Sequence, residues 1–228
     1  YDFLYENDTP TGITFKINYD GNVLPISLRG VLGEQHIYPS VIAVATALMM
    51  KVNPIDIIPG LQDQYFAPGR MRVLEGEDGS VVIDDTYNSS PIAVKRALQT
   101  LAVVNNRGKK IAILGDMLEL GRYSHSEHQK VGKLVASLKI DYLICVGVRS
   151  EATADSAIEN GMSEKNVIKV SKSKKAIPLA TQMLAEGNVF LVKGSQGVRM
   201  ERITAELIAE KEKLGQLLVR QEDEWQRR

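Results

Sequence analysis

The chain has 228 residues, 44% of them hydrophobic and 25% charged, which is the composition of an ordinary globular protein with a sizeable core. Its 28 basic and 28 acidic residues cancel, which removes the bulk electrostatic case for binding nucleic acid or an anionic membrane. The single cysteine, Cys145, excludes an intramolecular disulfide framework and a multi-cysteine zinc site, and favours a reduced, cytoplasmic location.

Two alternating apolar patterns open the chain. Residues 12–19 place Ile13, Phe15 and Ile17 on one face, and residues 23–28 alternate in the same way. Asp20-Gly21 lies between them, and this dipeptide between two alternating runs predicts a β-hairpin. The chain also begins without Met, inside a strand-like region, so we expect it to be a piece of a longer protein.

Two helices are predicted after the hairpin. The first runs from about Ser40 to Met50 and contains the longest apolar run of the chain, which favours a buried helix. The second is short, with Asn53 as its cap and Pro54 at its first helical position.

A domain boundary is predicted next. Pro59-Gly60 and Pro68-Gly69 flank a polar linker, Gln62-Asp63-Gln64, and turn-forming pairs of this kind separate structural units. We therefore divide the chain into residues 1–66 and residues 67–228.

After Arg70, short β-branched runs alternate with amphipathic helical patterns. Continuous apolar strands separated by helices predict an α/β domain with a mostly parallel, Rossmann-like sheet and helices on both faces. In such a sheet ligands bind at the carboxyl ends of the strands, so the loops there are the candidate sites. The strands are predicted at 81–83, 109–114, 142–146, 167–170 and 189–192, the helices near 91–104, 125–138, 151–160, 173–186 and 200–219, and a solvated helix end at 221–228.

The first candidate loop is Asp84–Pro91. Pro91 suits the start of a helix and Ser90 suits its cap. The residues left without a local role are Asp84, Asp85, Tyr87 and Asn88. Two adjacent carboxylates at a strand end could hold a ribose hydroxyl, a metal ion or an ammonium group. An elaborate capping loop is the alternative.

The second candidate loop is Gly115–Gly121. It carries two acidic residues, Asp116 and Glu119, separated by apolar residues that would pack the loop down. His128 follows within the next predicted helix, where a lone histidine is more often a helix-surface residue than a catalyst.

The third is Lys193-Gly194-Ser195, which supplies a cation, a hydroxyl and accessible amides just before a helix, a suitable cradle for an anion or carboxylate. Neither G-x-x-x-x-G-K-[ST] nor G-x-G-x-x-G occurs in the chain.

Together these segments resemble the Mur ligase family of peptidoglycan synthesis. The resemblance implies three domains, of which the last is Rossmann-like: residues 67–228 would be that domain and residues 1–66 the closing part of the central, ATP-binding one. The UDP-sugar domain, the P-loop and the magnesium ligands would then lie outside this chain. The matching pieces are Pro68-Gly69-Arg70, Asp84–Pro91, Leu114–Gly121 with His128, and Leu191–Ser195.

Within that family, the closest resemblance is to the enzymes that join UDP-N-acetylmuramoyl-tripeptide to D-alanyl-D-alanine, with ATP and Mg²⁺. ATP phosphorylates the tripeptide carboxylate, and the dipeptide amine attacks the acyl phosphate. The resemblance implies that these 228 residues alone are inactive, and it gives no residue a catalytic step or a metal. It assigns Arg70, Asp85 and Asn88 to the nucleotide, Lys193, Gly194 and Ser195 to the dipeptide, and Asp116, Glu119 and His128 to the support of the site.

One segment departs from the family pattern. Residues 33–39 read G-E-Q-H-I-Y-P, where the family is close to G-R-H-N-x-x-N, so Gln35, His36 and Pro39 replace the residues expected beside adenine. Two other readings stay open: a stand-alone α/β binding module without catalysis, and another ligase of the superfamily such as a folylpolyglutamate synthase. The loop that begins at Asp84 weighs against the second.

Overall fold

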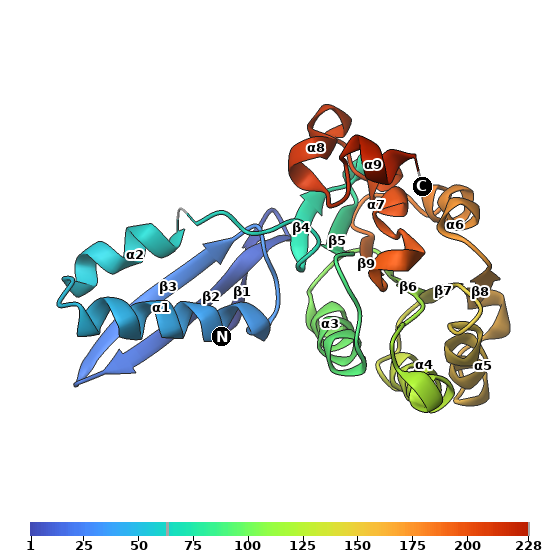
Figure 1. The fold of residues 1–228 in the computed structure, drawn as a ribbon, viewed down its shortest axis with the longest axis horizontal. Coiled ribbons are helices and arrows are strands. Elements are labelled where there is room, and N and C mark those ends of the chain that lie inside the picture. Colours follow the sequence, from blue (N-terminus) through green and yellow to red (C-terminus); the bar gives the residue numbers. More distant parts are fainter. Residues whose placement is uncertain (63, 228) are drawn as a thin grey trace.

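Two sheets organise the chain, and each carries its own helices (Figure 1). The computed structural model describes residues 1–62 and 64–227. A three-stranded antiparallel sheet with two helices forms the N-terminal part, and a six-stranded sheet with helices on both faces forms the C-terminal part.

The N-terminal sheet contains the predicted hairpin. β2 (Thr9–Tyr19) and β3 (Asn22–Arg29) pair antiparallel, with Asp20 and Gly21 at positive φ angles of 44° and 74° in the turn between them. A third strand, β1 (Asp2–Glu6), was not predicted; it pairs with β2 along the edge of the sheet. As an edge strand it has no fully buried residue, so it lacks the alternation that marks β2.

The predicted apolar helix exists, but the prediction that it is buried is wrong. In α1 (Ile37–Met49) only Ser40 and Val44 are buried, whereas Ile42 is 67% and Met49 is 85% exposed. The helix packs only one stripe of side chains onto the core, so the remaining apolar side chains face outward.

The second helix extends beyond its prediction. α2 (Pro54–Gln62) begins as expected, since Asn53 Oδ1 accepts a hydrogen bond of 3.1 Å from the Ile55 N–H. It then continues through Pro59 and Gly60, the pair predicted to flank the linker, as far as Gln62. Asp63 of that linker lies outside the described residues, and the division between residues 66 and 67 stays a prediction.

The C-terminal sheet has the predicted α/β character, and the fold class is confirmed. Its strand order is β4-β5-β9-β6-β7-β8, and all pairs are parallel except the edge pair β4–β5. The antiparallel strand β4 was not predicted. The strands are β4 (Arg72–Glu75), β5 (Val81–Asp85), β6 (Lys110–Gly115), β7 (Tyr142–Val146), β8 (Val167–Val170) and β9 (Val189–Lys193).

Helices cover both faces of this sheet, which explains its continuous apolar strands. Side chains alternate between two cores: Leu191 of β9 joins the core beneath α3, whereas Phe190 and Val192 join the core beneath α7. Figure 1 shows the two helix layers on opposite sides of the sheet. One layer is α3 (Pro91–Val103), α4 (Ser124–Ser137) and α5 (Glu151–Glu159), and the other includes α6 (Ser173–Thr181) and α7 (Glu201–Leu207).

The long helix expected at 200–219 is wrong. α7 ends at Leu207, because the following backbone pairs with the sheet edge instead: Ile208 bridges to Gly76, and the Ala209 N–H donates to Glu75 O at 3.0 Å. The chain then forms two short helices, α8 (Leu214–Leu217) and α9 (Asp223–Gln226). α9 falls in the tail that was expected to be a helix end, and residue 228 of that tail lies outside the described residues.

Backbone hydrogen bonds tie the two parts together. The Leu32 N–H donates to Met71 O at 3.0 Å, and the Val73 N–H donates to Gly30 O at 2.9 Å. The buried core also runs without a break from the N-terminal sheet to the α3 side of the C-terminal sheet. These contacts place the N-terminal part beside the carboxyl ends of β5 and β9.

Candidate functional site

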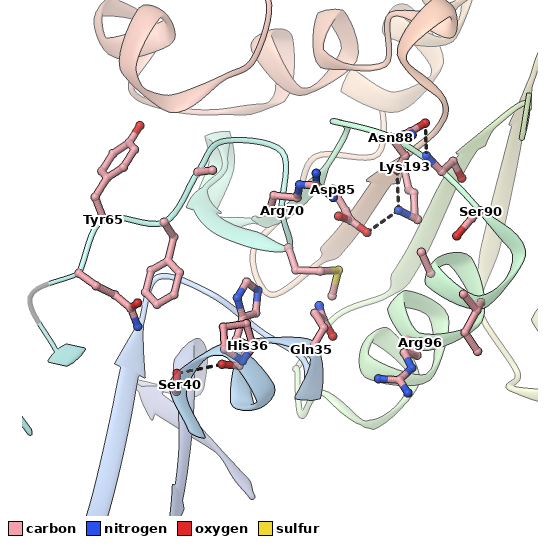
Figure 2. Close-up of a pocket in the computed structure, with 18 residues that line it drawn as sticks. Gln35, His36, Ser40, Tyr65, Arg70, Asp85, Asn88, Ser90, Arg96 and Lys193 are labelled. Atoms are coloured by element: carbon pink, nitrogen blue, oxygen red, sulfur yellow. Dashed lines mark hydrogen bonds and ion pairs between the residues drawn. The ribbon is translucent and has the colours of Figure 1, made fainter. Parts of the chain in front are cut away.

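A cavity of about 710 Å³ lies where the N-terminal part meets the carboxyl ends of β5 and β9. Its walls come from residues 35–40, 64–71 and 85–96, together with the end of β9. This is the edge of the sheet at which the sequence predicted a site. Figure 2 shows four predicted site residues on one side of this cavity: Arg70, Asp85, Asn88 and Lys193.

The centre of this group is a buried ion pair. β5 and β9 run parallel with Asp85 in register with Lys193, and Lys193 Nζ lies 2.7 Å from Asp85 Oδ2. Lys193 Nζ also donates a hydrogen bond of 2.8 Å to Asn88 O. The Lys193 side chain is only 2% exposed, so the carboxylate and the carbonyl replace the water that its charge has lost.

Of the two adjacent carboxylates, only Asp85 lines the cavity. Asp84 points to the other side of the strand and is fully buried, where it accepts hydrogen bonds from the Gly69 N–H at 3.0 Å and from the hydroxyls of Thr86 and Thr204. Burial raises the pKa of Asp84 to about 6, against these hydrogen bonds, which lower it. Asp84 thus holds the turn that leads to Arg70.

Arg70 lies on the rim of the cavity. Gly69 has a φ of +71°, and a Cβ there would come within 2.7 Å of the Tyr87 backbone nitrogen, so glycine is required for this approach. The Arg70 guanidinium carbon lies 4.0 Å from the centre of the Tyr87 ring. The alternative of an ion pair between Arg70 and Asp84 or Asp85 does not occur among residues 1–62 and 64–227. The guanidinium is exposed and suited to an incoming anion.

The loop that follows β5 ends in the N-terminus of α3. Pro91 begins α3, as expected, and Ser90 stands at the cap position. Ser90 is therefore the N-cap residue, as predicted, although its side chain forms no capping hydrogen bond.

The Gly115–Gly121 loop is joined to the loops after β7 and β9. Asp116 is buried, and its Oδ1 accepts a hydrogen bond of 2.7 Å from the Ser150 N–H, while its carbonyl accepts one of 3.0 Å from the Ser195 N–H. Asp116 thereby ties together the loops after β6, β7 and β9. Glu119 is exposed, with a φ of +65°, and lies outside the residues that line the cavity.

His128 is buried in α4, so the expectation of a helix-surface residue is wrong. Its Nε2 accepts a hydrogen bond of 3.0 Å from the Met117 N–H, and its Nδ1 lies 2.7 Å from Ser124 O. This pattern requires the proton on Nδ1. The histidine thus fixes the loop after β6 through Nε2, while Nδ1 bonds to the first turn of its own helix.

Gly194 and Ser195 do not line the cavity. A Cβ at Gly194 would come within 2.6 Å of the Met200 side chain, so this glycine serves close packing. Ser195 Oγ accepts a hydrogen bond of 2.9 Å from the Leu118 N–H. In this structure both residues join the loops after β6 and β9.

The structure adds cavity residues that were given no role from the sequence. Gln35, His36 and Pro39, noted only as departures from a family pattern, all line the cavity. Burial lowers the pKa of His36, and its ring packs edge-on against Phe66. Arg96 of α3 also lines the cavity and lies 2.8 Å from Glu34. Ile92, four residues earlier, lines the cavity too, so both lie on one face of α3.

Residues 69–196 match the family model described as "Mur ligase, glutamate ligase domain". The chain belongs to the Mur ligase family. The match begins at Gly69, beside the predicted boundary, and covers every candidate loop of the C-terminal part.

Relatives and solved structures agree with this assignment. The UDP-N-acetylmuramoyl-tripeptide–D-alanyl-D-alanine ligase of Buchnera aphidicola is 32% identical over 203 residues, covering 89% of this chain and 43% of that protein. The corresponding ligase of Bacillus subtilis is 28% identical, covering 78% of this chain and 39% of the other. A crystal structure of MurF from Acinetobacter baumannii superposes with a TM-score of 0.75 and 28% identity, over 86% of this chain and 42% of that one. The chain thus spans less than half the length of the Mur ligases that it matches.

A further fold match is the MurF ligase of Thermotoga maritima, solved in complex with ADP, with a TM-score of 0.71, 24% identity and coverage of 94% of this chain and 46% of that one.

Within the described residues of the present chain, no helix is long and apolar enough to cross a membrane. The same residues contain no cluster of three or more His, Cys, Asp or Glu that could hold a metal ion.

Proposed function

We propose that this chain is the C-terminal part of an ATP-dependent ligase that joins D-alanyl-D-alanine to UDP-N-acetylmuramoyl-tripeptide in peptidoglycan synthesis. The observation that carries the proposal is the cavity at the ends of β5 and β9, where Arg70, Asp85 and Asn88 lie together on a Mur ligase domain. The names of the most similar relatives support the choice of substrates.

In this proposal the three residues hold the nucleotide. The exposed guanidinium of Arg70 contacts phosphate oxygens, for which its planar fork is suited. Asp85 accepts hydrogen bonds from ribose hydroxyls or from a phosphate-bound water, and the ion pair with Lys193 holds that carboxylate in place. Asn88 lies beside the same nucleotide. Mg²⁺ would be held by residues outside this chain.

The role of Lys193, Gly194 and Ser195 in holding the incoming dipeptide stays a prediction. Lys193 is committed to Asp85 and Asn88, so it would have to exchange one of them for the dipeptide carboxylate. When the amine of the dipeptide attacks the acyl phosphate, a C–N bond forms and phosphate leaves. The protein has to hold the dipeptide amine and the acyl phosphate in line for this attack.

The test is a titration of the ¹⁵N-labelled 228-residue protein with ADP, D-alanyl-D-alanine and L-glutamate. We expect ADP to shift the amide signals of residues 70, 85–88 and 193, and the dipeptide to shift signals in residues 193–196. Asp85→Asn should weaken the ADP response, whereas the matched control Asp155→Asn, at an exposed ion pair on α5, should not. ADP shifts that are absent or unaffected by Asp85→Asn would refute the proposal. A response to L-glutamate alone would favour a folylpolyglutamate synthase.

The same proposal predicts that the 228 residues alone do not turn over ATP, because their sequence contains no G-x-x-x-x-G-K-[ST]. A coupled phosphate-release assay with both amide-forming substrates should stay at background. Turnover of about 1 s⁻¹ or more would contradict it. The product of the complete gene should form the amide; nucleotide binding without amide formation would favour a binding module instead.

A further inference from the structure

The C-terminal segment, residues 218–227, lies across the loop that joins β5 to α3. Its anchor is Arg220, which is 7% exposed and has a φ of +59°. Arg220 donates hydrogen bonds to the carbonyl oxygens of Thr86, at 3.0 Å, and Tyr87. One guanidinium therefore fixes two successive carbonyls of the proposed nucleotide loop, although 133 residues separate it from Tyr87 in the sequence.

A buried carboxylate orients this guanidinium. Glu201 is 1% exposed, and its Oε2 lies 3.1 Å from Arg220 while its Oε1 lies 2.5 Å from Arg199. Arg199 in turn donates to Trp225 O at 2.7 Å, and the Trp225 ring lies under both guanidiniums. Burying charged groups costs desolvation free energy, and pairing them does little more than offset that cost. The cluster is therefore better explained by the orientation that it gives to the loop than by a gain in stability.

The loop held by Arg220 also holds Arg70. The Tyr87 N–H donates to Gly69 O at 3.1 Å, which clamps the residue before Arg70, and the Tyr87 ring supports the Arg70 guanidinium at 4.0 Å. Arg220 fixes the carbonyl side of the same tyrosine. Contacts thus run without a gap from the C-terminal segment to the cation on the cavity rim.

We propose that Arg220 is a positioning residue: by fixing the backbone of Thr86 and Tyr87, it holds the Tyr87 ring where it supports Arg70 at the nucleotide cavity. This inference rests on the proposed function only in so far as Arg70 contacts a nucleotide. Arginine suits the task because its rigid fork can bond two carbonyls and a carboxylate at once, which a lysine ammonium on a flexible stem does not reproduce.

The test compares Arg220→Lys with Arg202→Lys in the 228-residue protein. Arg202 lies on α7, one residue after Glu201, and no ion pair or side-chain hydrogen bond links it to the β5–α3 loop. Arg220→Lys keeps a positive charge for Glu201 but loses the fork. The structural readout is the NMR chemical shift of the Arg70 Nε–H, which the ring current of Tyr87 should displace. If this displacement disappears in Tyr87→Leu, the Tyr87 ring is its cause.

We expect Arg220→Lys to abolish most of this displacement and to weaken ADP binding about fivefold, a change on the scale of one ordinary hydrogen bond. Arg202→Lys should change neither. Thr153→Ala, which removes a buried hydrogen bond to His128 O on the far side of the domain, should lower the melting temperature without moving the Arg70 signal. Thr153→Ala therefore shows whether a loss of overall stability alone can change the Arg70 signal.

An unchanged Arg70 signal in folded Arg220→Lys would overturn the inference. If Arg220→Lys does not fold, Trp225→Leu replaces it, because it keeps both guanidiniums while removing the ring beneath them, and the same signal decides. If the wild-type protein does not bind ADP, the proposed function fails, but the Arg70 signal still decides whether Arg220 positions Arg70. The two failures are therefore distinguishable.

Discussion

The two parts of the chain bury their apolar residues in different ways. In the C-terminal part, β9 is buried at every residue, because helices cover both faces of its sheet. In the N-terminal part, β2 is only partly buried and α1 leaves Ile42 and Met49 mostly exposed. Similar apolar content thus gives a two-sided core in one part and a one-sided core in the other.

This difference explains how the site is divided. The charged groups, Asp85 and Lys193, belong to the two-sided core, where neighbouring strands fix them on both flanks. The N-terminal part contributes a wall of side chains, including Gln35 and His36. The framework that orients charge is therefore the C-terminal sheet, and the N-terminal part closes the cavity.

Truncating one apolar side chain in each part should show the difference between the two cores most clearly. Phe190 is fully buried in β9, so Phe190→Ala should lower the free energy of unfolding by about 3–5 kcal/mol. Ile42→Ala on the exposed face of α1 should change it by about 0.5 kcal/mol or less. Guanidinium denaturation measures both. Equal losses would show that the α1 face is covered in solution.

A smaller effect should come from the buried carboxylate. Burial raises the pKa of Asp84 from 3.8 to about 6, so the folded protein holds this proton more tightly than the unfolded chain. The resulting stabilisation is present below pH 3.8 and is lost as pH rises through about 6, a loss of about 3 kcal/mol. Asp84→Asn should therefore gain stability relative to wild type over that window, measured by urea denaturation. Asp20→Asn, in the exposed hairpin turn, should follow the wild-type profile; a parallel profile for Asp84→Asn would contradict the prediction.

Arg70 should matter to the nucleotide more than to the fold. Under the proposed function, Arg70→Lys in the product of the complete gene should lower kcat/KM for ATP about tenfold, equivalent to about 1.4 kcal/mol, with little change in melting temperature. The control is Arg29→Lys, at an exposed ion pair with Glu6 in the N-terminal sheet, which should leave ATP kinetics unaltered. Wild-type ATP kinetics with a lowered melting temperature would make Arg70 a structural residue.

The smallest effect should come from an exposed ion pair between the two parts. Arg107 pairs with Asp8, and both side chains are at least half exposed, so Arg107→Gln should cost about 0.5 kcal/mol or less and nothing in 1 M salt. Lys169→Gln removes a comparable exposed pair within the C-terminal part and should behave alike. A larger, salt-resistant loss in Arg107→Gln alone would show that this ion pair fixes the arrangement of the two parts.

Local patterns of neighbouring residues were enough to predict most elements and the candidate loops. Alternation and Asp20-Gly21 predicted the hairpin, and the apolar runs predicted five of the six strands of the C-terminal sheet, because period and turn chemistry are properties of neighbouring residues. The strand ends then located Asp85 and Lys193, since parallel strands bring their carboxyl ends to one edge of a sheet.

The contacts of each polar residue depend on the folded arrangement of the chain. Asp84 and Asp85 are adjacent and identical in the sequence, yet one clamps Gly69 inside the domain and the other faces the cavity, because successive side chains of a strand point to opposite sides. His128 became a buried support, and the helix expected at 200–219 ended at Leu207, where the sheet edge competed for its backbone. The link from Arg220 to Tyr87 depends on a contact between residues far apart in the chain, which no local pattern encodes.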